Sequence, residues 1–258
     1  MPAPRNRLKK ALAEGRTQIG LWLALASPTV AEIAADSGFD WCLIDAEHGT
    51  SDIPLILAQL QAMSGGRAAP VVRVPAGEAW MLKRVLDLGA QTVLVPMVDS
   101  AAQAAGLVRA VRYAPQGMRG QGAAITRASR YGAIGDYVTT ANREICLIVQ
   151  AETRRAIGSI EAIAATEGVD CVFIGPADLA CDMGYPGNPD APEVQAAIES
   201  AICRIRAAGK AAGLLPAGHV PLARYRDLGA TFLGVGADVT LLGAAMAGLV
   251  NGVRAELG

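Results

Sequence analysis

A group of ionisable and amide side chains follows the ends of short apolar runs that read as buried strands. Its members are Asp45, Glu47, His48, Arg73, Gln150, Glu152 and Asp178. Polar groups at the end of a buried strand make a poor core and a good functional site. His48 is one of only two histidines in the chain. Solvated charges capping a strand end are the alternative explanation.

Glu152 and Asp178 are two carboxylates that follow consecutive strand-like runs. Together they could supply part of the oxygen shell of a hard divalent cation and leave positions for water and substrate. Alternatively, each carboxylate caps the helix that follows it. No HxH or HExxH pattern occurs, which argues against a zinc hydrolase.

Arg73 ends a run of apolar residues, where a buried guanidinium is costly unless it meets an anion. It could stabilise a developing oxyanion or form an ion pair with Asp45 or Glu47, and the two roles are compatible. His48 could act as a general base near neutral pH.

Several other chemistries lack the residues they need. The only lysines are Lys9, Lys10, Lys83 and Lys210, and none lies at the carboxyl end of a strand-like run, so Schiff-base chemistry is not expected. There is no GxSxG nucleophile elbow. No glycine pattern of a P-loop or a Rossmann fold is present, so no nucleotide cofactor is expected.

Strand-like and helix-like runs alternate from residue 19 to the C-terminus, after a short N-terminal helix at Asn6–Ala13. The expected strands are Ile19–Leu25, Trp41–Ile44, Pro70–Val74, Thr92–Val95, Ile145–Gln150, Cys171–Ile174, Ala211–Leu215 and Phe232–Val235. The expected helices are Thr29–Ser37, Ile53–Met63, Ala79–Leu88, Ala101–Val111, Arg155–Ala165, Glu193–Ala208, Val220–Leu228 and Val239–Leu257. This pattern predicts a single α/β domain over residues 1–258, a (β/α)8 TIM-type barrel. An open doubly wound sheet is the rival fold.

Two connections are longer than a plain barrel needs, Arg112–Asn142 and Asp178–Pro192. We expect both to follow strands and to lie at the carboxyl face of the barrel, where barrel enzymes keep their active sites. Their turn-forming residues suggest ordered lids.

Composition limits the partners and the compartment. Hydrophobic residues make up 52% of the chain and the net charge is -1, which offers little attraction for nucleic acid or an anionic membrane. No apolar run is long enough to span a bilayer, and no signal peptide is evident. Five widely spaced cysteines favour a reducing cytoplasm.

Several characteristic motifs follow one another between about Gly20 and the C-terminal helix: Phe39–His48, Val71–Arg73, Leu94–Met97, Arg112–Gly120, Val149–Thr153, Val172–Leu179 and Asp182–Tyr185. In their residues and their order they resemble the HpcH/HpaI aldolases. The resemblance implies a class II, metal-dependent aldolase whose small-molecule partners are pyruvate and an aldehyde. It also implies that Glu152 and Asp178 hold a divalent cation such as Mg²⁺, Mn²⁺ or Co²⁺.

The same resemblance assigns further roles. Arg73 would stabilise the enolate and His48 would be the base, with Asp87 making that histidine more basic. Asp45 and Glu47 would support His48. The residues expected to contact substrate are Gln150, Ala177 and Asp178 at the pyruvyl carboxylate, and Trp22 and Leu215 in the aldehyde pocket.

Val239–Leu257 is apolar nearly all round over its first turns, whereas a surface helix would show a polar face. It could pack deeply on its own barrel, but the resemblance implies a helix exchanged between subunits of a homohexamer. Two rival functions remain: a CoA-thioester lyase of the citryl or malyl type, and a non-catalytic barrel that binds oxo acids.

Overall fold

Eight parallel strands close into a barrel in the order in which they occur in the chain. The computed structural model describes residues 1–258. The strands are β1 (Gln18–Leu23), β2 (Trp41–Asp45), β3 (Ala69–Arg73), β4 (Thr92–Val95), β5 (Cys146–Ala151), β6 (Cys171–Ile174), β7 (Ala211–Leu214) and β8 (Phe232–Ala237). Since β1 also pairs with β8, the sheet has no free edge. The predicted (β/α)8 barrel is therefore confirmed, and the open doubly wound sheet is excluded.

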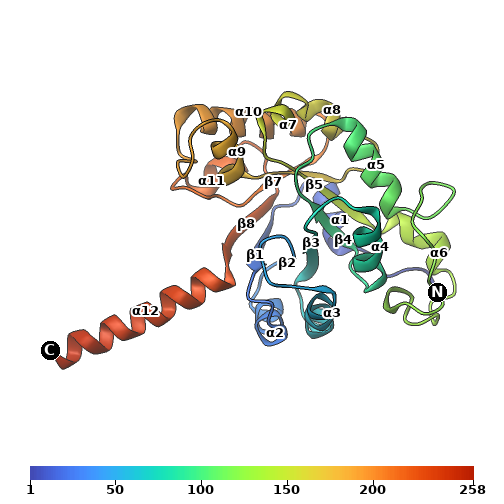
Figure 1. Cartoon of the computed structure of the whole chain (residues 1–258), viewed down its shortest axis with the longest axis horizontal. Helices are drawn as coiled ribbons and strands as arrows, with labels where there is room; N and C mark the ends of the chain where they lie inside the picture. The colour runs from blue at the N-terminus through green and yellow to red at the C-terminus, as the bar shows by residue number, and fades with distance from the viewer.

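Helices surround most of the barrel (Figure 1). They are α1 (Arg7–Ala13), α2 (Pro28–Asp36), α3 (Ile53–Ala62), α4 (Ala79–Asp87), α5 (Ala101–Val111), α6 (Tyr137–Thr140), α7 (Arg154–Gly158), α8 (Ile160–Ala165), α9 (Pro176–Asp182), α10 (Pro192–Ala207), α11 (Leu222–Asp227) and α12 (Asp238–Leu257). Three short 3-10 helices are η1 (Met63–Gly65), η2 (Arg127–Ser129) and η3 (Ala141–Arg143).

Local signals explain where many of these helices start and stop. The side chains of Ser27, Asp52, Ser100 and Thr153 each accept a hydrogen bond from a backbone amide in the first helical turn, as N-caps do. Glycines with positive φ follow the ends of α2, α4, α8, α10 and α11, which explains the repeated glycine signal at the helix-to-strand turns.

Three helical segments differ from the prediction, and one of them is α6, a short helix within the Arg112–Asn142 connection that was not expected. The expected helix Arg155–Ala165 is divided at Ser159 into α7 and α8, because Ser159 (φ -107°, ψ 11°) leaves the helical conformation directly after Gly158. A short helix that was not expected, α9, follows β6 and begins at Pro176, a residue suited to the first turn of a helix.

Aromatic rings fill the interior of the barrel. Trp41 stacks on Phe232 with ring centroids 4.0 Å apart, and Trp22 meets Trp41 edge-on at 5.5 Å. Gly20 gives the Trp41 ring its space, since a Cβ at Gly20 would lie 2.0 Å from it. A second, larger apolar cluster lies between the strands and the surrounding helices.

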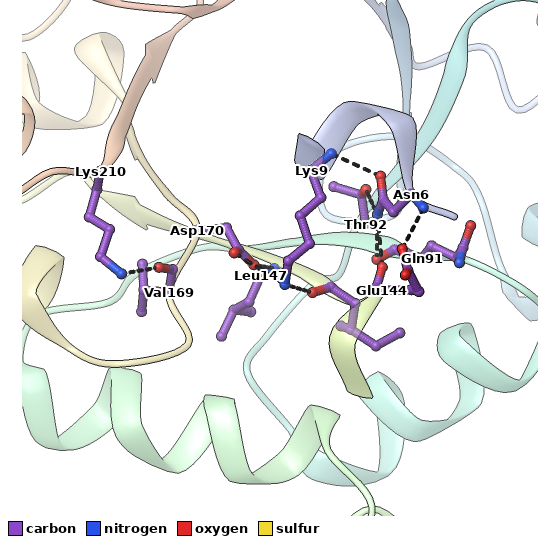
Figure 2. A network of polar contacts seen from close by, with 10 residues as sticks. Asn6, Lys9, Gln91, Thr92, Glu144, Leu147, Val169, Asp170 and Lys210 are labelled. Carbon is purple, nitrogen blue, oxygen red and sulfur yellow. Dashed lines mark hydrogen bonds and ion pairs between the residues drawn. The ribbon is translucent and has the colours of Figure 1, made fainter. Parts of the chain in front are cut away.

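The segment that contains α1 packs against the amino-terminal end of the barrel through buried polar contacts (Figure 2). Asn6 caps α1, and its Nδ2 is shared by the Gln91 carbonyl, the Thr92 hydroxyl and the Glu144 carbonyl. Lys9 Nζ donates to the Ile145 carbonyl and pairs with Asp170. These contacts tie the start of the chain to β4, β5 and β6.

The long connection Arg112–Asn142 lies at the amino-terminal end of the barrel, so the expectation of a lid at the carboxyl face was wrong. The connection follows α5 and leads into β5, and such helix-to-strand segments lie opposite the strands' carboxyl ends. Arg127 within it donates to the Leu88 carbonyl at the end of α4, and Thr140 accepts from the Ala3 amide. The other long connection, Asp178–Pro192, follows β6 and does lie at the carboxyl face.

Helix α12 extends away from the barrel (Figure 1), so it does not pack deeply on its own chain. Only Asp238 is buried in it, and Asp238 accepts hydrogen bonds from the Ala24 and Leu25 amides. Leu249 is 70% exposed. Crossing a membrane requires a helix that is both long and strongly apolar, and none of the helices meets both conditions.

Replacement of Asn6 tests how much the α1 segment stabilises the barrel. We expect Asn6→Ala to lower the free energy of unfolding by about 2 kcal/mol, because it removes an N-cap and leaves buried carbonyls unpaired. Chemical denaturation of both proteins measures the difference. Arg5→Ala, at an exposed neighbouring position, is the matched control, and an equal loss in both variants would contradict this role of Asn6.

Candidate active site

A cavity of about 250 Å³ opens at the carboxyl ends of the strands. Seven of the residues singled out in the sequence line it: Trp22, His48, Arg73, Gln150, Ala177, Asp178 and Leu215. They come from β1, β3, β5, α9 and the segments after β2 and β7. Closure of the barrel thus brings together residues that are far apart in the sequence.

Arg73 is held between two carboxylates. Its Nε and Nη2 donate to Asp45 Oδ1 and Oδ2 at 2.9 and 2.7 Å, and its Nη1 lies 3.0 Å from Glu47 Oε2. Burial opposes the charge of Arg73, but the bonds to Asp45 and the nearby carboxylates outweigh it and raise its pKa. The guanidinium therefore stays charged and fixed in orientation.

Asp45 also shapes the turn that carries His48. Its Oδ1 accepts hydrogen bonds from the backbone amides of Glu47 at 3.1 Å and His48 at 3.4 Å. Gly49 completes the turn, since a Cβ there would lie 2.4 Å from the Asp45 carbonyl oxygen. The His48 side chain is 67% exposed, and its Nε2 lies 3.9 Å from Glu47 Oε2. The imidazole is thus accessible at the cavity while a carboxylate lies near it.

Glu152 is a buried carboxylate without a direct cationic partner. It is 2% exposed. Its Oε1 accepts a hydrogen bond from the Met97 amide at 2.8 Å, and its Oε2 accepts a hydrogen bond from Gln150 Nε2. Burial raises the pKa of Glu152 to about 7, and the nearby carboxylates Asp178 and Glu47 add to the effect. Thr153, not Glu152, caps α7, so the capping alternative does not explain Glu152.

Asp178 lies in the first turn of α9 and is exposed to the cavity. No side chain caps α9, so the capping alternative does not explain Asp178 either. Its charge contributes to the raised pKa of both Glu152 and Glu47. Of the two carboxylates that the sequence predicts as cation ligands, Asp178 therefore acts electrostatically on Glu152.

The donors at this position suit a hard divalent cation. Gln150 Oε1 is buried and has no hydrogen-bond partner, and Glu152 lacks a countercharge. No group of three or more His, Cys, Asp or Glu side chains is close enough to bind a metal by itself. A site with two carboxylates fits a cation such as Mg²⁺ that completes its shell with water and substrate oxygens.

Within one chain, Asp87 does not contact His48. It ends α4 and accepts a hydrogen bond from Arg119 Nη2 at 2.7 Å. The Arg119 side chain is fully covered, and its guanidinium lies 4.4 Å from the centroid of the Tyr113 ring. Asp87 therefore belongs to a polar cluster beside the Arg112–Asn142 connection, outside the cavity.

Met97 and Gly175 support the cavity but were not singled out by their chemistry. Met97 has a positive φ of 57°, an uncommon conformation for a side-chain-bearing residue, and its amide donates to Glu152. A Cβ at Gly175 would lie 2.6 Å from Glu152 Oε2 and 2.9 Å from Glu152 Cβ. Both lie within motifs that carry the family resemblance, which is the one sequence signal for them.

The closed barrel and this group of residues define a (β/α)8 barrel protein with a polar, carboxylate-rich cavity at the carboxyl ends of its strands. A family model described as HpcH/HpaI aldolase/citrate lyase matches residues 18–245. The chain therefore belongs to the HpcH/HpaI aldolase/citrate lyase family.

Individual relatives agree with that assignment. A hydroxypyruvate/pyruvate aldolase of Agrobacterium fabrum is 58% identical, covering 93% of this chain and 90% of its own length. A 4-hydroxy-2-oxo-heptane-1,7-dioate aldolase of Salmonella dublin is 52% identical, covering 92% and 90%. The crystal structure of a family protein from Burkholderia cenocepacia superposes with a TM-score of 0.92 at 39% identity, covering 96% and 99%. The expected resemblance and the aldolase class are confirmed.

Replacement of Gly175 tests the close packing against Glu152. We expect Gly175→Ala to weaken Mn²⁺ binding at least about tenfold, because the added methyl group displaces a buried carboxylate. Titration of Mn²⁺ by electron paramagnetic resonance measures the affinity, and circular dichroism checks the fold. Gly158→Ala is the control, since a Cβ at Gly158 meets nothing within 4 Å. Unchanged Mn²⁺ affinity in Gly175→Ala would argue against a cation at Glu152.

Proposed function

We propose that the protein reversibly cleaves 4-hydroxy-2-oxo acids into pyruvate and an aldehyde. The observation that carries the proposal is a cavity lined by a fixed Arg73, an accessible His48 and Asp178. The buried carboxylate of Glu152 lies directly behind Gly175 of the cavity wall. The names of the aldolase relatives support it. A CoA-thioester lyase is not favoured, because Arg73 is the only arginine or lysine that lines the cavity and it is already paired with carboxylates.

Glu152 and Asp178 would hold the divalent cation, and Mg²⁺, Mn²⁺ and Co²⁺ are the proposed ions. When bound, the cation supplies Lewis-acid polarisation of the 2-oxo group. No lysine side chain lines the cavity, which favours this chemistry over a Schiff base.

The substrate would be oriented by the remaining polar groups of the cavity. Gln150 and the backbone at Ala177–Asp178 position the pyruvyl carboxylate. Arg73 points its fixed positive charge at the oxygen that becomes the enolate, and a charge held in place before the reaction stabilises the transition state without reorganisation. Trp22 and Leu215 contact the aldehyde part of the substrate.

His48 would act as the base in the cleavage direction. It takes the proton of the C4 hydroxyl, and the electron pair of that O–H bond forms the aldehyde carbonyl. The C3–C4 bond breaks and its electron pair remains on pyruvate as the enolate. Protonation of C3 then gives pyruvate. Asp45 and Glu47 support the turn that holds His48 in reach of the substrate.

The proposed assembly is a homohexamer in which α12 packs on a neighbouring subunit. Leu242, Met246 and Leu249 form an apolar stripe at spacings of four and three residues, and all three are exposed. Within one chain Asp87 is bound to Arg119, so its proposed support of His48 requires a second copy. A cytoplasmic location, suggested by the cysteine content, belongs to the same proposal.

Chelation tests the proposed reaction. We expect EDTA to lower retro-aldol cleavage about 100-fold or more, and Mg²⁺, Mn²⁺ or Co²⁺ to restore it. Pyruvate release, coupled to lactate dehydrogenase, measures the rate. Glu152→Gln should not be rescued by the cations, whereas the surface variant Glu161→Gln should behave like the wild type. Exchange of pyruvate methyl protons in D₂O excludes a non-catalytic binding protein, and full activity in chelator would refute the proposal.

Charge on the apolar stripe tests the assembly. We expect the double variant Leu242→Glu, Leu249→Glu to lose the hexamer, because four or more buried like charges cannot share one interface. Multi-angle light scattering gives the mass in solution. Asn251→Glu, on the opposite side of α12, is the control that should leave the mass unchanged. A hexamer that persists in the double variant would show that α12 does not hold it together.

A further inference from the structure

The segment between β7 and α11, residues 215–221, borders the cavity and is anchored outside it. Leu215, Pro216 and Ala217 line the cavity. Two residues further on, the His219 backbone amide lies 3.0 Å from both carboxylate oxygens of Asp190, and His219 Nδ1 lies 2.9 Å from Oδ2. We call this segment the β7–α11 loop and the Asp190–His219 contact the latch.

The loop wraps closely around the carboxylate. A Cβ at Gly218 would lie 2.0 Å from Asp190 Oδ1, so only glycine lets the backbone approach this far. Hydrogen bonds from the His219 side chain and backbone lower the pKa of Asp190. The carboxylate is therefore charged at neutral pH and accepts from more than one donor of the loop.

The residue directly before Asp190 is held by buried groups. Gln195 Nε2 donates to the Pro189 carbonyl at 2.8 Å, and the Tyr225 hydroxyl donates to Gln195 Oε1 at 2.8 Å. Tyr225 is 2% exposed and Gln195 7%. Because Gln195 lies on α10 and Tyr225 on α11, these bonds fix Asp190 relative to both helices that flank the loop.

The latch contributes position more than stability. The His219 side chain is fully exposed, and an exposed ion pair adds little to the free energy of unfolding. However, the His219 backbone amide contacts both oxygens of the Asp190 carboxylate, and His219 Nδ1 contacts one of them. Gly218 packs directly against the same carboxylate. Such a set of bonds determines the path of a loop even where it stabilises the fold only slightly.

The residues that line the cavity differ in chemistry. Arg73, Gln150 and Asp178 supply polar groups, whereas the β7–α11 loop contributes only Leu215, Pro216 and Ala217. The carboxylate and oxo group of pyruvate need the polar groups. The carbon chain of the aldehyde therefore meets the apolar wall that the loop provides.

We propose that Asp190 and His219 are positioning residues that fix the β7–α11 loop as the wall against the aldehyde. They set the KM for the aldehyde and leave the enolisation of pyruvate unaffected. This inference rests on the proposed aldolase function, and the reaction can be divided into two measurable parts. Proton exchange of pyruvate reports enolisation alone, and aldol addition reports the aldehyde as well.

Steady-state aldol addition and pyruvate proton exchange should respond differently to loss of the latch. In Asp190→Ala and His219→Ala we expect the KM for the aldehyde to rise about tenfold, with proton exchange within about twofold of the wild type. Gly218→Ala should likewise raise the KM for the aldehyde and leave proton exchange nearly unchanged, since the added methyl group displaces the Asp190 carboxylate from the loop. His219→Asn keeps a donor near Nδ1 and should restore the KM.

Asp227→Asn is the matched control, an exposed carboxylate of α11 that pairs with Arg226 and not with the loop. Amide hydrogen exchange at His219 adds a readout that does not depend on activity, and protection there should fall in Asp190→Ala but not in Asp227→Asn. An unchanged KM in all three latch variants, or an equal loss of exchange and addition, would overturn the inference.

The two proposals fail in different ways. A wild-type protein that exchanges no pyruvate protons with its cation present contradicts the aldolase function. In that case the protection of the His219 amide still decides whether Asp190 holds the loop: equal protection in the wild type and in Asp190→Ala overturns the latch.

Discussion

The carboxyl end of this barrel depends on one constraint, the burial of Glu152 without a countercharge in contact with it. A buried carboxylate is costly unless hydrogen bonds or a cation compensate it. The Met97 amide and Gln150 provide the hydrogen bonds, but the pKa is still raised to about 7. Only a proton or a cation can complete the compensation. The left-handed backbone of Met97 and the missing side chain of Gly175 keep the carboxylate in that state.

The charged side chains around the cavity fall into two groups, an arginine with its carboxylate partners and two carboxylates without a cationic partner. Asp45 and Glu47 both contact Arg73, so the one arginine of the cavity is held in place by its own neighbours. Glu152 and Asp178 remain, and the charge of Asp178 adds to the burial that raises the pKa of Glu152. In the proposed reaction this arrangement separates two tasks: a rigidly held guanidinium would stabilise an oxyanion, and a pair of carboxylates without a cationic partner would hold a cation. An arginine that also paired with Glu152 and Asp178 would be less available to an oxyanion, and it would occupy the carboxylates that a cation needs.

The sequence predicts the barrel and most of the cavity because both rest on local signals. N-caps, helix-ending glycines and apolar runs mark the elements, and the parallel strands then bring their carboxyl ends together. The prediction put the Arg112–Asn142 connection at the wrong end of the barrel. The connection follows a helix and not a strand, and therefore lies at the amino-terminal end. The hydrogen bonds that Arg119 donates to Asp87 and His219 donates to Asp190 join residues 32 and 29 positions apart. No periodicity records such contacts, and the same holds for the φ of Met97.

Stability and selectivity come from different parts of the fold. The amino-terminal end is held by buried polar bonds of Asn6 and by the aromatic rings inside the barrel, so changes there act on the whole domain. The wall formed by the β7–α11 loop is held by exposed contacts to one carboxylate. A change in that loop alters the shape of the cavity while the core, Glu152 and Asp178 stay in place. An enzyme built in this way can change the aldehyde it accepts without losing either its fold or its chemistry.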